Sequence, residues 1–216
     1  MTGIIIPFYV YPTDPTWSEV IRAKRAYPFN PILAVVNPDS GPGVVLDPIY
    51  AQAIWTLKLA GVKVLGYITT GYGVKDRMAI QAEQVNYRTW YHVSSWFFDE
   101  VAADATHRDY YAKLGNTVDF TVGNPGVKIP NDYIGLMDNF VVYEGPGMPN
   151  QPLPPNFDPK NFSFIAYGLT TFPSTITIDG YGYIYLTNGV EPDPYSSVSW
   201  LWETLAALQK TGVSHP

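Results

Sequence analysis

Acidic residues end two of the apolar segments of this chain, and their types and spacing could support acid–base chemistry. The segment SSWFFDEVAAD, residues 94–104, runs from two phenylalanines straight into Asp99 and Glu100, with no basic residue beside them. Further along the chain, the segment NFVVYE ends on Glu144. Cleavage of a glycosidic bond needs one protonated and one ionised carboxyl group. Apolar neighbours and mutual repulsion push two such pKa values apart.

Other catalytic groups are scarce. The chain has no Cys, which excludes disulfides, thiolate catalysis and zinc sites built on Cys. It has three His residues, so a multi-His metal site or a His-dependent triad is disfavoured, and a metal-dependent deacetylase with them. We therefore expect carboxylates to carry any acid–base chemistry, and we expect no metal or other cofactor.

Charge and hydropathy exclude several classes of partner. The net charge is −6, charged residues make up 15% of the chain, and no basic run occurs, so nucleic acid is excluded as a partner. An acidic surface suits a cationic ligand better. No apolar run approaches the ~20 residues of a membrane span. The start, MTGIIIPFYVYP, lacks a basic region and a cleavage site, so it predicts a strand and not a signal peptide.

Short apolar segments alternate with helical ones along the chain. Most of the apolar segments are continuous runs, the pattern of strands covered on both faces in a parallel sheet. The predicted strands are residues 3–10, 32–38, 63–70, 94–100, 119–125, 139–144, 162–168 and 182–188. The predicted helices are residues 16–27, 47–60, 75–92, 105–114 and 196–212.

End signals support several of these helices. Thr16 and Glu19 have the spacing of a capping box. Asp47 followed by Pro48 predicts the start of the second helix, and Gly61 its end. By the same reasoning, Asp104 caps the fourth helix and Gly115 ends it.

Eight strands, each followed by a helix or a loop, predict a compact (β/α)8 barrel that forms one catalytic domain over residues 1–216. Helices after strands five to seven are weak or missing, since NDYIGLM is brief and residues 145–161 are rich in proline. An open doubly wound sheet is the alternative, because alternation alone does not separate the two folds. A monomer is favoured.

In a barrel the carboxyl ends of all strands meet at one rim, where active sites lie. Strands four and six are separated by roughly 9–10 Å at the backbone, so their acids could approach to ~5–9 Å. Alternation along strand four points Asp99 and Glu100 to opposite sides, so at most one should face inward unless the strand has already ended. Other side chains at the predicted rim are candidates for binding substrate: Tyr9, Tyr11, Asn37, Tyr67, Thr69, Tyr72, Asn124, Tyr167 and Asn188.

Five motifs in this order resemble the spherulin-4 family of glycoside hydrolases: GIIIPFYVYP, VVNPDSGPG, AGVKVLGYITTGYG, WFFDE and YEGP. The resemblance covers nearly the whole chain. It implies a (β/α)8 barrel that cleaves within an α-linked polymer of N-acetylgalactosamine, or a partly deacetylated relative, in microbial exopolysaccharide. It also implies an extracellular location, although this chain shows no signal segment.

The same resemblance implies site roles. The essential acids of the family match Asp99, Glu100 and Glu144. Related barrel hydrolases imply a retaining course with Asp99 as nucleophile and Glu144 as acid/base. Alternatively, the N-acetyl group of the substrate acts as nucleophile and Asp99 or Glu100 orients it. The rival from another class is a carbohydrate-binding, spore- or biofilm-associated protein without turnover.

Overall fold

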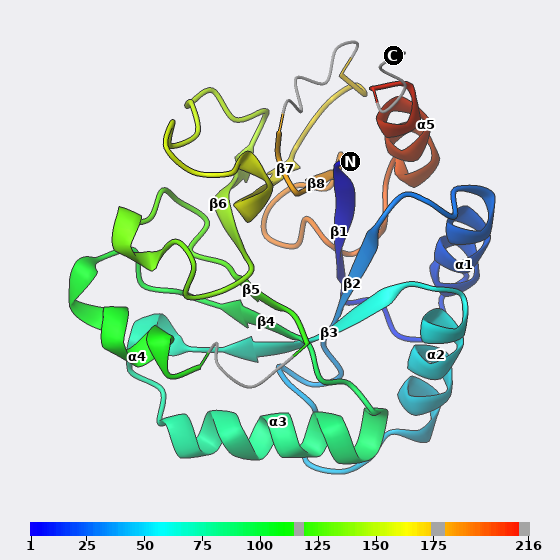
Figure 1. The fold of residues 1–216 in the computed structure, drawn as a ribbon. Coiled ribbons are helices and arrows are strands. Elements are labelled where there is room, and N and C mark those ends of the chain that lie inside the picture. Colours follow the sequence, from blue (N-terminus) through cyan, green and yellow to red (C-terminus); the bar gives the residue numbers. More distant parts are fainter. Residues whose placement is uncertain (115–118, 174–179, 212–216) are drawn as a thin grey trace.

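The chain forms a closed barrel of eight parallel strands in sequence order, which confirms the predicted (β/α)8 class and rules out the open sheet (Figure 1). The structure is a computed structural model and describes residues 1–114, 119–173 and 180–211. Every strand pairs in parallel with the strands before and after it, and β8 closes the barrel against β1.

The strands are short and almost wholly buried. Their continuous apolar sequences suit this position, because the core fills one face and the outer layer covers the other. Most are shorter than predicted, since the last polar residues leave the ladder at the rim. The strands are β1 (Gly3–Phe8), β2 (Ile32–Val36), β3 (Lys63–Thr69), β4 (Trp96–Asp99), β5 (Thr121–Gly123), β6 (Asn139–Pro146), β7 (Phe162–Tyr167) and β8 (Tyr183–Leu186).

Strand β6 carries an irregularity that matters for the site. Its register against β7 shifts between Val141 and Tyr143, so Val142 has no partner in the ladder. An extra residue of this kind bends a strand and changes the direction of the side chains that follow. Tyr143 and Glu144 come directly after this shift.

Helices cover only part of the barrel. The α-helices are α1 (Thr16–Ala26), α2 (Pro48–Leu59), α3 (Arg77–Tyr91), α4 (Arg108–Ala112) and α5 (Leu201–Thr211). Helices α5, α1, α2 and α3 follow one another around the barrel on the side of β1 to β3 (Figure 1). Among the described residues, β5 and β6 are followed only by short 3-10 turns, Asn131–Tyr133 and Pro159–Asn161, as the proline-rich sequence predicts.

The helix-end predictions have mixed outcomes. Asp47 caps α2 by accepting hydrogen bonds from the backbone N–H of Ile49 and Tyr50, and Gly61 follows the helix with φ of 87°, as predicted. The capping box at Thr16 is wrong. Thr16 is already helical, and both its backbone N–H and its hydroxyl bind the carboxylate of Asp14. The carboxylate earlier in the chain is the stronger acceptor and displaces the hydroxyl from the capping role.

Two further helices differ from their predicted bounds. Residues 105–114 divide into a 3-10 turn, Ala105–His107, and the short α4, with Asp104 capping the turn as predicted. Gly115 lies outside the described residues. Helix α5 begins at Leu201 and not at residue 196, because Trp200 has φ of 49°, which a right-handed helix does not accept.

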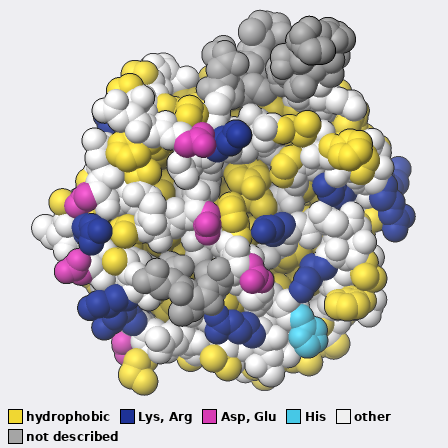
Figure 2. Space-filling view, in the orientation of Figure 1, with side chains coloured by type: hydrophobic (Ala, Val, Ile, Leu, Met, Phe, Trp, Pro, Cys, Tyr) yellow, Lys and Arg dark blue, Asp and Glu magenta, His cyan; other side chains and the backbone are white. Residues whose placement is uncertain are grey.

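The surface matches the low charge of the sequence. Lys and Arg side chains are spread over the face seen in Figure 2 among uncharged and hydrophobic ones, and do not gather in one patch. Within residues 1–114, 119–173 and 180–211, no helix is long and apolar enough to cross a membrane.

We expect Asp47→Ala to lower the free energy of unfolding by about 1 kcal/mol, because two N–H groups of α2 lose their acceptor. Asp47→Ser keeps a capping oxygen and should restore most of this loss. Chemical denaturation of the three proteins measures the difference. Equal stability of the Ala and Ser variants would contradict the capping role.

Candidate active site

A single amide joins the two predicted acids at the mouth of the barrel. Asn124, which directly follows β5, donates from Nδ2 to Asp99 Oδ1 at 2.9 Å and to Glu144 Oε2 at 2.6 Å. Its Oδ1 accepts from the backbone N–H of Gly126 at 3.0 Å, and this bond fixes which end of the amide faces the acids. The structure therefore brings Asp99, Asn124 and Glu144, from three consecutive strand ends, into one cluster.

Asp99 is the last residue of β4, directly after the buried Phe97 and Phe98. Its Oδ2 accepts a hydrogen bond from the hydroxyl of Tyr67 on β3 at 2.8 Å. Burial raises the pKa of Asp99, while the hydrogen bonds from Tyr67 and Asn124 oppose that rise by stabilising the charged form. An apolar strand that ends at the rim thus places a half-buried carboxyl among neutral donors.

Glu144 lies on β6 in a similar environment. Burial raises its pKa, the nearby charge of Asp99 adds to that rise, and hydrogen bonds from Tyr195 and Asn124 act against it. The hydroxyl of Tyr195 donates to Glu144 Oε1. No basic side chain forms an ion pair with either acid in the described part of the chain, so hydrogen bonds from neutral groups are the main stabilisation of the ionised forms.

Glu100 lies beside this pair and not in it. Its backbone has φ of 53°, so the strand ends before it and the side chain turns toward β3, where the hydroxyl of Thr69 donates to its carboxylate. The hydroxyl of Thr70 holds the turn by donating to the carbonyl oxygen of Glu100 at 2.7 Å. A left-handed conformation is strained for Glu, and strain of this kind is concentrated at functional sites.

Tyrosine rings line the mouth between the two acids. The ring of Tyr9 contacts those of Tyr67 and Tyr195 edge-on, with centroids 5.7 and 5.9 Å apart. Burial, followed by the charge of Asp99, holds the pKa of Tyr9 well above its usual value, so its hydroxyl stays neutral. The hydroxyls of Tyr67 and Tyr195 donate to the acids, and the ring of Tyr9 packs against both of their rings.

An open cavity of about 530 Å³ lies over Glu144. Tyr9, Tyr167 and Tyr195 line it together with Glu191 and Asp193 from the segment after β8. A hydrogen bond to Glu191 is the main cause that raises the pKa of Tyr167 to about 12. The cavity offers aromatic faces and acidic groups to a ligand, which is the chemistry of a sugar site.

In the described part of the chain, four of the predicted substrate-binding residues make no side-chain hydrogen bond to either acid. The hydroxyl of Tyr11 donates to Asp47, the side chain of Asn37 accepts from the backbone of Gly41 and shapes its loop, and Asn188 accepts from Ser199. Tyr72 is 60% exposed, and its φ of 55° turns the loop after β3. Contact of these four with substrate stays a prediction.

Tyr195 and Glu191 were not among the predicted site residues. Both lie in the segment EPDPYSS after β8, between the last predicted strand and the last predicted helix. A tyrosine among polar residues beyond the last strand is the signal that could have identified Tyr195, because the same pattern follows the first and third strands. Within the described residues no group of three or more His, Asp or Glu side chains could hold a metal ion.

Comparisons with known proteins bear on the family and the fold of the chain. The model of the spherulation-specific family 4 matches residues 3–208. Spherulin-4 of Physarum polycephalum is 30% identical over 152 residues, which cover 67% of this chain and 45% of that protein, so the chain spans less than half the length of this relative.

The crystal structure of Aspergillus clavatus Sph3 in complex with GalNAc has a similar fold. Its TM-score is 0.82 at 21% sequence identity, and the match covers 96% of this chain and 97% of Sph3. At this identity the likeness establishes the fold. The family match extends over nearly all of the barrel, and we conclude that the chain belongs to the spherulation-specific family 4.

Proposed function

We propose that the protein is an endo-acting glycoside hydrolase that cleaves an α-linked polysaccharide containing N-acetylgalactosamine or galactosamine. The observation that carries this proposal is the Asn124 bridge, which holds two half-buried carboxyl groups over one mouth. The binding of GalNAc by Sph3, a protein of the same fold, supports the choice of sugar.

The spacing of the acids supports a retaining course. One nitrogen reaches both Asp99 Oδ1 and Glu144 Oε2, so the sum of its two hydrogen-bond lengths is the largest separation these oxygens can have. For these two oxygens the limit is within the ~5–5.5 Å typical of retaining glycosidases and below the ~6.5–9.5 Å typical of inverting ones. The second carboxyl group would thus attack the sugar directly, with no water between them.

In this mechanism Asp99 is the nucleophile. It accepts hydrogen bonds from Tyr67, Asn124 and the backbone of Glu100, which favour its ionised form. Its free lone pair attacks the anomeric carbon while Glu144 donates its proton to the leaving oxygen. Glu144 then takes a proton from water, which attacks the glycosyl ester and frees Asp99.

Glu144 suits the acid/base role because it lines the open cavity, where a leaving group and then water can enter. Burial favours its protonated form before the reaction. Glu100 is fixed toward Thr69, which suits a positioning role. If the N-acetyl group of the substrate is the nucleophile, Asp99 or Glu100 would orient it instead.

We expect Asp99→Asn and Glu144→Gln each to lower kcat by about 10³-fold or more, because one loses the nucleophile and the other the proton donor. Release of oligosaccharides from galactosaminoglycan, followed by mass spectrometry, measures this. Glu203→Gln, an exposed change of the same kind on α5, is the matched control. Turnover that survives both site variants would reject the mechanism, and saturable binding without turnover in the unchanged protein would identify a carbohydrate-binding protein.

The two tyrosines give a second test through pH. Tyr195→Phe removes a hydrogen bond that lowers the pKa of Glu144, so this pKa should rise. The alkaline limb of kcat/KM, where the acid loses its proton, should then move to higher pH. Tyr67→Phe acts in the same way on Asp99 and should move the acid limb to higher pH.

Each substitution should move one limb and leave the other in place. If Tyr195→Phe moves the acid limb and Tyr67→Phe moves the alkaline limb, the roles of Asp99 and Glu144 are exchanged. A profile unchanged in both variants would contradict the proposed coupling of the tyrosines to the acids.

A further inference from the structure

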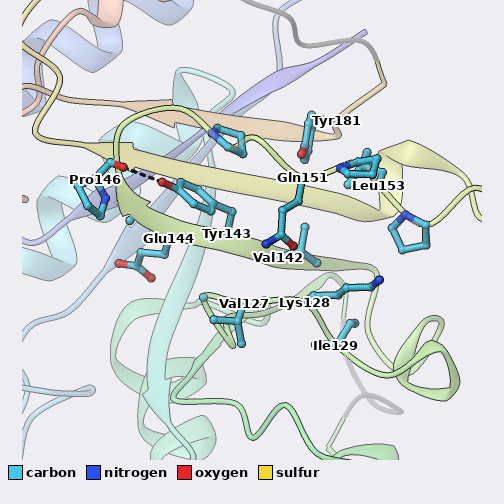
Figure 3. A pocket seen from close by; sticks show the side chains of 15 residues that line it. Val127, Lys128, Ile129, Val142, Tyr143, Glu144, Pro146, Gln151, Leu153 and Tyr181 are labelled. Atoms are coloured by element: carbon cyan, nitrogen blue, oxygen red, sulfur yellow. Dashed lines mark hydrogen bonds between the residues drawn. The ribbon is translucent and has the colours of Figure 1, made fainter.

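A second cavity of about 530 Å³ lies along strand β6, next to the cavity at the mouth (Figure 3). One wall is the segment after β5, residues 126–129, and the other is the proline-rich segment, residues 149–154. Its volume is within the ~300–1,000 Å³ of typical ligand pockets. None of the predicted substrate-binding residues lies in it, and we name it the outer cavity.

No residue of a described α-helix lines the outer cavity. Prolines 149, 152 and 154 line it and restrict the backbone of its wall, so this wall is largely preformed. The hydroxyl of Tyr143 donates to the carbonyl oxygens of Pro146 and Gly147, at 2.8 and 3.2 Å, which fixes the ring in the cavity (Figure 3).

The outer cavity adjoins the candidate active site. Glu144, Gly126 and Val127 line both cavities. The backbone N–H of Glu144 donates to the carbonyl oxygen of Gly126 at 2.9 Å, so the shared edge is held by a hydrogen bond. A polymer bound at Glu144 therefore lies beside the outer cavity, at the residues that the two cavities share.

The chemistry of the outer cavity is mostly apolar, with few polar groups. Its apolar walls include Ile129, Val142 and Leu153. The amide of Gln151 and the ammonium of Lys128 also line it, away from Glu144 (Figure 3). Neither side chain has a hydrogen bond or ion pair with the part of the protein that the structure describes, so both are available to a ligand.

We propose that the outer cavity is a subsite for an N-acetylated hexosamine unit of the same glycan, one or more sugars away from the bond cleaved at Glu144. The apolar walls suit the methyl group of an acetamide, and the amide of Gln151 complements its N–H and C=O. The positive charge of Lys128 repels the ammonium group of a deacetylated sugar and so disfavours its binding. This subsite rests on the proposed glycan and deepens the proposed function by setting its acetylation preference.

Binding measured by calorimetry in the Glu144→Gln background tests the subsite without turnover. The probes are α-linked galactosamine oligosaccharides, fully acetylated and fully deacetylated, with the GalNAc monosaccharide beside them. We expect Gln151→Ala to lower the affinity for the acetylated oligosaccharide about fivefold, which is the effect of one lost hydrogen bond. Lys128→Glu should lower the ratio of acetylated to deacetylated affinity about tenfold, and monosaccharide affinity should not change.

Gln52→Ala and Lys113→Glu are the matched controls, since both side chains are exposed, Gln52 on α2 and Lys113 directly after α4, and neither lines the cavity. Thermal denaturation of every variant separates loss of binding from loss of fold. Site variants that bind like their controls would overturn the subsite even if the unchanged protein cleaves the glycan. Variants that lose binding while the unchanged protein shows no cleavage would support the subsite and reject the hydrolase. Absence of any oligosaccharide binding would reject both.

Discussion

The hydrogen bonds from one buried amide to two carboxyl groups are the interaction on which the site depends. Asp99 and Glu144 lie on strands that are not neighbours, and Asn124 comes from the strand between them. Because its oxygen is engaged by the backbone of Gly126, the nitrogen can only face the acids. The closed barrel supplies the three strand ends, and the amide sets their separation.

This arrangement stabilises charge without neutralising it. An Arg or Lys beside the acids would hold both ionised, and neither could then donate a proton to a leaving group. Tyrosine hydroxyls and an amide lower the pKa values less than a cation would, and burial acts in the opposite direction. The balance leaves each carboxyl with a raised pKa, which suits a pair that must occupy different protonation states.

The uneven outer layer of the barrel also has functional consequences. Regular helices follow the first three strands, and loops and 3-10 turns follow β5 and β6. The proline-rich segment that replaces a helix leaves space along β6, and the register shift at Val142 lies in the same strand. The half of the barrel with fewer helices therefore carries both the acid Glu144 and the two cavities that meet at it.

The sequence by itself determined the strands, their parallel-sheet pattern and the placement of the acids at strand ends, and it favoured the barrel, but only the structure excluded an open sheet. These follow from local rules, because a continuous apolar run buries itself and a polar residue after it must reach the rim. The capping of α2 by Asp47 follows from an equally local pattern, because Asp47 is followed directly by Pro48. The capping box at Thr16 failed because Asp14, outside the motif, is a stronger acceptor.

Only the tertiary structure decided which polar residues meet. The turn of Glu100 toward Thr69 depends on a left-handed backbone that no local pattern specified. Tyr195 reaches Glu144 because closure of the barrel brings the segment after β8 across the mouth. Strand and helix signals act over a few residues, whereas contacts between residues far apart in the chain depend on how the whole barrel closes.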